Sequence, residues 1–223
     1  MDGDRLAQLE EQMRSTSLYE CKLALDELSQ CPSDLAVPVL ERLLAGQDVV
    51  RRRFAVMGLG NHQTEASFQI LKTLLEQEAD VNILAEAANS IFEFGEPSIP
   101  LLQDLFLRSQ NWLVRQTILS VMMEANNDEV LLELIRAGLD DEEQTVKETA
   151  ILALGQVLKG PYHDAAVEVL ARLSESPNWR DRWRAATTLC LASGQQAKTL
   201  LAKLRNDDNH NVVAAALEAG LPE

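Results

Sequence analysis

The stretch that decides the fold runs from Asp48 to Gly60 and reads DVVRRRFAVMGLG. It opens with an acid, which can accept hydrogen bonds from the free N–H groups of a helix's first turn. Small and apolar residues follow at helical spacing, and the final glycine is of the type that ends a helix in the left-handed conformation. Weaker copies of this pattern occur before and after it. We therefore interpret the stretch as one helix of a repeated pair.

A leucine recurs at near-equal intervals along the chain, each time inside an apolar pattern of helical period. The steps between these leucines are 31, 31, 31, 29, 39 and 31 residues. Between them lies a second apolar segment that begins after a capping position, and most of these positions hold Ser, Asp or Asn. The leucines are Leu9, Leu40, Leu71, Leu102, Leu131, Leu170 and Leu201, and the capping positions are Ser17, Asp48, Asp80, Asn111, Glu143, Asn178 and Asn209.

These landmarks predict seven pairs of helices, within residues 4–29, 33–60, 64–95, 97–125, 128–158, 163–193 and 195–219. The first helices carry the leucines and are expected over 4–13, 33–45, 64–77, 97–108, 128–138, 163–174 and 195–206. The second helices are expected over 18–29, 49–59, 81–94, 112–125, 144–158, 179–192 and 210–219. Their packing side is rich in alanines that let neighbouring helices approach closely: Ala24, Ala55, Ala87, Ala88, Ala150, Ala153, Ala185, Ala186 and Ala215.

A two-helix unit that repeats about every 31 residues is typical of an α-solenoid of HEAT or armadillo type, in which each pair buries its apolar face against its neighbours. We expect an all-α protein: a single domain over residues 1–223, forming a right-handed, crescent-shaped solenoid of about seven HEAT-like pairs. The long step contains Lys159–His163, where Gly160 and Pro161 must break a helix. This segment is either a tolerated surface insertion or a loop that helps to bind a partner.

The composition narrows the classes of partner. The chain holds 35 acidic and 20 basic residues, a formal charge of −15, so its mean potential repels nucleic acid and anionic lipid. No apolar run approaches the roughly 20 residues that cross a bilayer, and the N-terminus does not resemble a signal peptide. We expect no nucleic-acid partner, no membrane insertion and a cytoplasmic protein.

The cysteines do not follow a metal-binding pattern. Cys21, Cys31 and Cys190 form no CxxC pair and leave an odd thiol, and the three histidines are scattered without ligand spacing. We expect ordinary packing residues and no internal metal site. The alternative is a metal or cluster that these thiols share with a partner protein.

The most unusual local sequence is NWRDRWR, residues 178–184. On a helix, Trp179 with Trp183 and Arg180 with Arg184 are i,i+4 neighbours, which gives an indole pair beside a guanidinium pair. Such a group could stack a flat conjugated ligand and bind its carboxylates, or it could anchor a protein partner. The alternative is structural: the indoles fill a gap in the irregular sixth repeat, and the arginines pair with Asp181 and nearby acids.

Two further segments hold candidate binding residues. Trp112 directly follows a capping Asn, as Trp179 does, which favours a functional role for both indoles. The three arginines at 51–53 fan around a helix and cannot all serve one ligand. Arg52 either joins a ladder of ion pairs between repeats, with Asp80 or Asp48, or binds an anionic partner.

Three segments carry a resemblance to a known family: residues 48–60, residues 111–115 (NWLVR) and residues 146–155 (VKETAILALG). They resemble the HEAT-like repeats of phycobilisome lyases, and the order of units is similar to that of the cyanobacterial phycobilisome degradation protein and related HEAT-repeat adaptors. The resemblance covers nearly the full length. It implies a concave surface lined by second helices that hold a tetrapyrrole or its carrier protein.

The resemblance also implies roles for basic residues in the first turns of the second helices. A propionate-binding role is carried over to Arg52, Arg115, Lys147 and Arg184. The chain departs from that pattern where the position holds Cys21, Leu84 or Val213, so the basic ladder is not uniform.

The patterns leave the choice between enzyme and scaffold open, with a preference for a scaffold because we recognise no catalytic motif. The leading hypothesis is a scaffold for a protein partner, either a phycobiliprotein or a factor in its assembly or turnover, that requires no cofactor. The second is a phycobilin lyase or chromophore-detaching protein that binds a phycocyanobilin-type bilin. The third is an adaptor for an iron–sulfur assembly protein. The candidate ligand- or partner-binding residues are Arg52, Trp112, Arg115, Trp179, Arg180, Asp181, Trp183 and Arg184.

Overall fold

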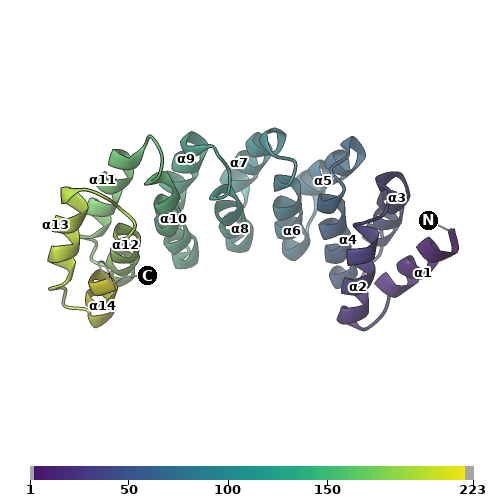
Figure 1. Ribbon diagram of the computed structural model, residues 1–223, viewed down its shortest axis with the longest axis horizontal. Helices are drawn as coiled ribbons and strands as arrows, with labels where there is room; N and C mark the ends of the chain where they lie inside the picture. Colours follow the sequence, from purple (N-terminus) through teal and green to yellow (C-terminus); the bar gives the residue numbers. More distant parts are fainter. Residues whose placement is uncertain (1–2, 219–223) are drawn as a thin grey trace. The chain divides into compact units, whose positions relative to one another are not determined.

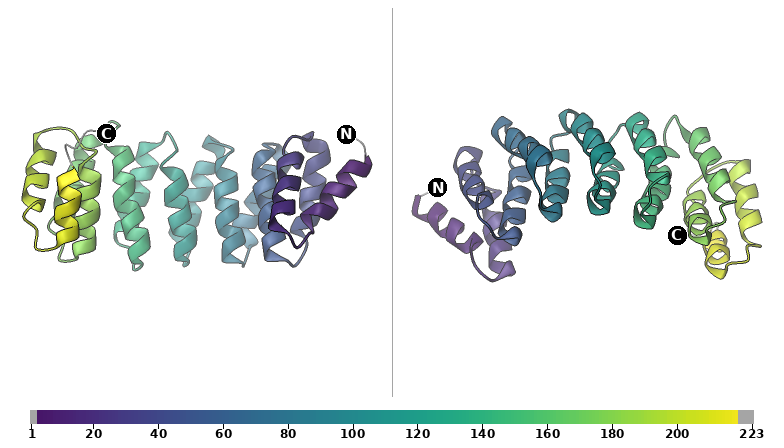
Figure 2. Two further views of the ribbon diagram at one scale, coloured as in Figure 1. Left: turned by 60° about the horizontal axis from the view of Figure 1, so that its bottom comes forward. Right: turned by 180° about the vertical axis from the view of Figure 1, so that it is seen from behind.

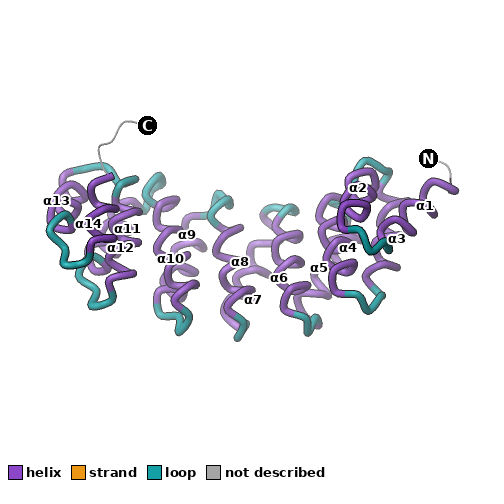
Figure 3. The backbone as a smooth tube through the Cα atoms, turned by 90° about the horizontal axis from the view of Figure 1, so that it is seen from below, coloured by secondary structure: helices purple, strands orange, loops and turns teal. Residues whose placement is uncertain are grey.

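The computed structural model describes residues 3–218, and this part of the chain folds into fourteen α-helices and one 3₁₀ turn, with no strand (Figures 1 and 3). The chain divides into two compact units, Met1–Ile118 and Leu119–Glu223. Within residues 3–218, no helix combines the length and the apolar character needed to span a bilayer. The expected all-α solenoid architecture is confirmed.

In the first unit the chain runs up and down through short turns, as the views of Figure 2 show. Second helices pack on second helices, α2 on α4 and α4 on α6, while the first helices α1, α3 and α5 pack against their own partners α2, α4 and α6. The helices are α1 (Gly3–Met13), α2 (Leu18–Leu28), α3 (Ser33–Leu44), α4 (Val49–Asn61), α5 (Glu65–Gln77), α6 (Val81–Phe92), the 3₁₀ turn η1 (Glu96–Ser98), α7 (Ile99–Arg108) and the larger part of α8 (Trp112–Met122).

The second unit repeats the same arrangement. Helix α10 packs on α12 and α12 packs on α14, so that its second helices also form a row. Its helices are the end of α8, then α9 (Asp128–Leu139), α10 (Gln144–Val157), α11 (His163–Leu173), α12 (Trp179–Leu189), α13 (Gln195–Leu204) and α14 (His210–Glu218). The expected end of the last helix at residue 219 lies outside the described residues.

The repeated leucines form the core, as predicted. Six of the seven are fully buried, and Leu201 is 6% exposed. The nine alanines on the second helices are buried as well, which lets α4 approach α6 and α10 approach α12. Within each unit, a helix pair therefore buries its apolar residues against the next pair, as expected for a repeat protein.

The capping residues start the second helices at the predicted positions. The side chains of Ser17, Asp48 and Asp80 accept hydrogen bonds from backbone N–H groups two or three residues later. Asn111, Asn178 and Asn209 accept from residues two positions on. Glu143 is different: its side chain makes no capping bond, and its own N–H donates to Asp141 instead.

The prediction that Gly60 ends its helix is wrong. Helix α4 continues to Asn61, and the glycines with positive φ among the described residues are Gly95 and Gly194. A Cβ atom on Gly60 would lie 3.0 Å from Cβ and 3.2 Å from Cα of Ser90. The glycine therefore serves the close approach of α4 to α6 rather than a turn.

The helix expected over 97–108 also differs from the structure. A 3₁₀ turn occupies Glu96–Ser98, and the α-helix begins only at Ile99. Gly95, at φ 71°, turns the chain after α6. Pro97 and Pro100 lack N–H groups, so both sit where a helix leaves its first donors unpaired.

Candidate functional site

The segment NWRDRWR comprises the capping residue and the first turns of α12, which packs on α10 and on α14. The ring centroids of Trp179 and Trp183 lie 6.2 Å apart, with their planes tilted by 34°. The guanidinium of Arg184 lies over the ring of Trp183 at 4.0 Å, and that of Arg180 lies 5.8 Å from the centroid of Trp179. Both distances are within the range of cation–π attraction. The structure thus brings together four of the predicted residues as one cluster.

An acid of the preceding pair completes this cluster. Glu148, on α10, accepts hydrogen bonds at its Oε2 from Nε and Nη2 of Arg184, at 3.0 and 2.9 Å. Its Oε1 lies 3.8 Å from Nε of Arg180. The Glu148 side chain is only 14% exposed, whereas that of Arg180 is 52% exposed. We call Glu148, Trp179, Arg180, Trp183 and Arg184 the Trp–Arg cluster.

Asp181 belongs to a different set of contacts. It accepts hydrogen bonds from the amide of Gln144, the hydroxyl of Ser176 and the amide of Asn178. All three donors are neutral, so the expectation that the arginines of this segment pair with Asp181 is wrong. The carboxylate instead ties the start of α12 to the start of α10.

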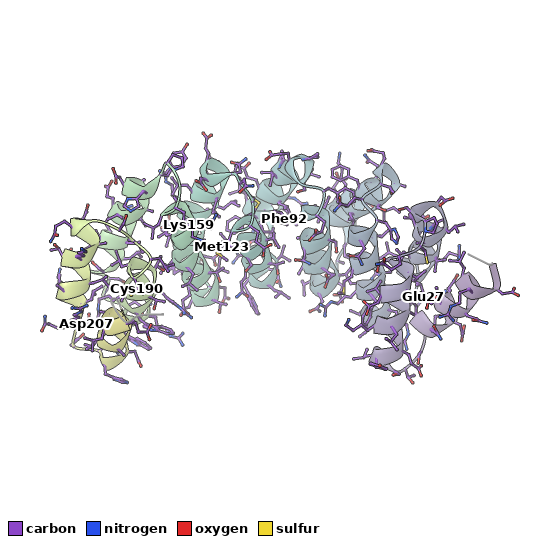
Figure 4. All side chains as sticks on the ribbon, viewed as in Figure 1. Glu27, Phe92, Met123, Lys159, Cys190 and Asp207 are labelled. Carbon is purple, nitrogen blue, oxygen red and sulfur yellow. The ribbon has the colours of Figure 1, made fainter. Side chains whose placement is uncertain are left out.

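The repeated basic position in the sixth pair is Arg182 and not Arg184. The position four residues after the capping residue is basic in four of the seven pairs: Arg52, Arg115, Lys147 and Arg182. Arg182 donates Nε and Nη2 to the carboxylate of Asp207, which lies in the turn between α13 and α14 (Figure 4). This pair lowers the pKa of Asp207 to about 2. Arg182 therefore joins one repeat to the next.

Arg52 makes the same kind of contact in the first unit. Its Nη2 pairs with Glu78, and its Nε donates to the carbonyl of Leu44. The predicted ladder thus holds for Arg52, although the acid is Glu78 and neither Asp80 nor Asp48. Glu78 stands two residues before its capping position, as Asp207 does. The guanidinium of Arg52 is thus bound within the protein, which argues against a ligand-binding role for Arg52.

Trp112 and Arg115 belong to the first unit. Trp112 directly follows its capping Asn and is 42% exposed, close to the 36% of Trp179 in the matching position of the second unit. Arg115 donates Nη1 to the carbonyl of Ser109. The two indoles therefore occupy equivalent positions, each at the start of a second helix in its own unit.

The insertion Lys159–His163 borders a cavity of about 530 Å³ in the second unit. Lys159 lies at the start of this loop (Figure 4). A Cβ atom on Gly160 would lie 1.9 Å from a carboxylate oxygen of Asp128, so the loop packs closely against the start of α9. Polar side chains from both segments line the cavity: Asn126, Asn127, Asp128, Glu129, Gln156, Lys159 and Tyr162.

The three cysteine thiols donate hydrogen bonds to backbone carbonyls. Cys21 donates to the carbonyl of Met13, and Cys31 donates to that of Glu27. Cys190 donates to the carbonyls of Ala186 and Ala215. Among residues 3–218, no three His, Cys, Asp or Glu side chains come together in a way that could hold a metal ion. Burial raises the pKa of Cys31, which disfavours its thiolate form.

Sequence reasoning missed Glu148, Arg182 and Gln144. The fixed spacing of four residues from the capping position could have identified Arg182. Glu148 and Gln144 carry no such signal, because their partners are 34–37 residues away and only the packing of α10 on α12 brings them together.

Pairs of antiparallel helices in repeated register, with second helices packed in a row within each unit, define an α-helical repeat protein. The sequence matches the HEAT repeats family over residues 36–123 and 129–221. The chain belongs to the HEAT-repeat family.

Solved structures with the same fold have low sequence identity to this chain. YibA of Escherichia coli superimposes with a TM-score of 0.68 at 15% identity, over 99% of this chain and 82% of that one. The complex of CpcE and CpcF of phycocyanin lyase from Nostoc sp. gives a TM-score of 0.50 at 16% identity, covering 96% of this chain and 93% of that one. An engineered protein gives 0.52 at 19% identity, over 96% of this chain and 67% of its own. These similarities establish the fold alone.

No curated protein sequence matches this chain significantly.

Proposed function

We propose that this chain is a cytoplasmic binding scaffold that holds a protein partner on the exposed face of α10 and α12. The observation that carries the proposal is the Trp–Arg cluster. Trp179 exposes about a third of its surface, and the Arg180 side chain exposes about half. Tryptophan and arginine are the residues that most often dominate the energy of protein interfaces. A surface of this composition on a repeat fold supports protein recognition.

Site-specific photocrosslinking tests this proposal. A benzophenone amino acid replaces Thr145, which is exposed on α10 one turn before Glu148, or Glu168, which is exposed on the first helix α11. In cells that produce the protein, we expect a discrete crosslinked product from position 145 and none from position 168. The product should disappear in Trp179→Ala. Equal labelling from both positions, or labelling that Trp179→Ala leaves unchanged, would overturn the proposal.

We further propose that the partner is a phycobiliprotein or a factor in its assembly or turnover. Two observations support this narrower assignment. The repeats resemble those of phycobilisome lyases, and the fold is similar to that of CpcE and CpcF of phycocyanin lyase. Mass spectrometry of the crosslinked product identifies the partner, and recovery of an unrelated protein would contradict the assignment.

Binding of a linear tetrapyrrole is the second candidate function. The indole pair offers flat apolar area, and two guanidinium groups lie beside it for propionate groups. Purified protein is titrated with phycocyanobilin while the visible spectrum is recorded. Saturable spectral change that Arg180→Gln weakens would support this function. An unchanged spectrum would exclude it and leave protein docking.

A further inference from the structure

The Trp–Arg cluster contains one more cation than it contains acids. Arg180 and Arg184 both face Glu148, and Glu148 is nearly buried. The two hydrogen bonds from Arg184 use the Oε2 atom of that carboxylate. A single carboxylate thus neutralises two guanidinium groups incompletely.

Arg180 is the less engaged of the two arginines. Its nearest acidic atom is 3.8 Å away, beyond hydrogen-bond distance, and its side chain donates no hydrogen bond within the described residues. Arginine offers five N–H donors in a fork that matches a carboxylate. The exposed donors of Arg180 therefore remain able to bind a second carboxylate beside the ring of Trp179, which is about one-third exposed.

The sign of this local charge is opposite to that of the chain. The protein as a whole carries −15 and attracts basic segments without specificity. Within the five residues of the Trp–Arg cluster the surplus is positive and lies against the indole rings. Charge complementarity at this position thus favours an acidic segment, whereas the mean potential favours a basic one.

We propose that the Trp–Arg cluster binds an acidic peptide segment of the partner, with an Asp or Glu next to an aromatic residue, and that Glu148 acts as an internal competitor for the two arginines. The partner's carboxylate binds Arg180, and its aromatic side chain packs on Trp179. Glu148 holds Arg184 over Trp183 and limits the attraction for acidic segments. This inference rests on the proposed function and names the chemistry of the partner at the same site.

The proposal predicts opposite effects for two substitutions. Glu148→Gln keeps the shape of the side chain but removes the internal charge, so the acidic segment should bind about 3- to 10-fold more tightly. Arg180→Gln should weaken binding by a similar factor. Glu168→Gln, on the exposed side of α11, changes the net charge by the same amount as Glu148→Gln and serves as the matched control.

A random 12-residue peptide library displayed on phage supplies the probe. We expect selection on the wild-type protein to enrich peptides with Asp or Glu within two residues of Trp, Tyr or Phe. The best peptide, with any Trp replaced by Phe, and a copy with Asn and Gln in place of its acids are then titrated against a Trp112→Phe protein, whose only tryptophans are Trp179 and Trp183. Binding is followed by the tryptophan emission of the protein. The acidic peptide should bind more tightly than its neutral copy. Glu148→Gln should strengthen its binding, Arg180→Gln should weaken it, and Glu168→Gln should leave it unchanged.

Enrichment of basic or uncharged peptides would overturn the inference, as would equal binding of the acidic and neutral copies. A Glu148→Gln effect no larger than that of Glu168→Gln would overturn the competitor role. If Glu148→Gln does not fold, Arg180→Gln on an exposed side chain still decides the charge preference. Crosslinking from Thr145 is independent of this selection: a crosslink that forms without acidic preference rejects this inference alone, and loss of the crosslink rejects the proposed function.

Discussion

Arg182 and Asp207 form a two-point ion pair between α12 and the turn before α14, with Nε to Oδ2 at 2.7 Å and Nη2 to Oδ1 at 2.8 Å. The Asp207 side chain is 8% exposed, so water does little to solvate its charge. Nη2 of Arg182 also contacts Asp208. Arg52 and Glu78 make the equivalent contact in the first unit. These pairs tie consecutive repeats together at a fixed register.

Removing Arg182 should therefore destabilise the second unit. Arg182→Met leaves Asp207 nearly buried without its cation, and we expect the free energy of unfolding to fall by about 2 kcal/mol. Urea denaturation followed by tryptophan fluorescence measures the change, because Trp179 and Trp183 lie on the same helix. Lys22→Met, which breaks an exposed pair with Asp26, should cost less than about 0.5 kcal/mol. Equal losses in the two variants would contradict the assignment.

The same pair predicts a loss of stability in acid. The pKa of Asp207 falls to about 2, mainly because Arg182 donates hydrogen bonds to its carboxylate. The unfolded chain then binds a proton at a higher pH than the folded chain. The stabilisation, about 2 kcal/mol, is complete above pH 4 and is lost as the pH falls toward 2. Thermal melts between pH 2 and 5 should show a shallower decline for Asp207→Asn than for the wild-type protein, and parallel curves would reject the prediction.

Gly60→Ala should destabilise the first unit although alanine favours helices. The new Cβ would meet Cβ, Cα and the carbonyl oxygen of Ser90 at 3.0–3.2 Å, and backbone atoms cannot rotate away as a side chain can. Alanine raises helix propensity by about 1 kcal/mol, and overpacking costs about 1–3 kcal/mol. We expect a net loss of about 1 kcal/mol in urea denaturation. Ser90→Gly should restore part of it, and a more stable Gly60→Ala protein would show that α4 and α6 can move apart.

The sequence predicts those features of the fold that depend on residues close together in the chain. Capping residues such as Asp48 and Asn178 act on N–H groups two or three positions away, so their role can be recognised from spacing alone. The buried leucines follow in the same way from helical period.

Features that depend on distant residues could not be recognised in this way. From the sequence of α4 alone, Gly60 is predicted to end a helix. Its actual role depends on the close contact with Ser90, and that contact exists only after α6 has packed on α4. The pairing of Glu148 with Arg184 spans 36 residues and depends on the packing of α10 on α12. Trp179, Arg180, Trp183 and Arg184 were predictable as a group, since they share one helix, whereas their counter-ion was not.

His62 should make the first unit less stable below neutral pH. It is buried, its Nε2 donates to the carbonyl of Leu28, and its Nδ1 contacts the hydroxyl of Ser33 at 3.1 Å. Burial lowers its pKa, so the folded chain keeps the ring neutral while the unfolded chain binds a proton below about pH 6.5. The contribution of the neutral His62 to the free energy of unfolding is therefore complete above pH 6.5 and is lost as the pH falls below it. Urea titrations between pH 7.5 and 5.5 should show this slope, reduced in His62→Gln and retained in His210→Gln.

Trp179 and Trp183 should separate binding from stability. Trp183 lies under the guanidinium of Arg184 and is partly buried, so Trp183→Ala should lower both partner binding and the free energy of unfolding, the latter by about 2 kcal/mol. Trp179 is more exposed, and Trp179→Ala should change the free energy of unfolding by less than about 1 kcal/mol. Trp179→Ala should weaken partner binding strongly, because exposed aromatic anchors of interfaces contribute about 2 kcal/mol or more.

Crosslinking from Thr145 should fall at least about tenfold in Trp179→Ala at a fixed partner concentration. Trp112→Ala removes an indole at the same register position in the first unit, and it should leave this crosslink unchanged. If Trp112→Ala and Trp179→Ala reduced the crosslink equally, the partner would contact the indole after the capping Asn in both units and not the Trp–Arg cluster in particular.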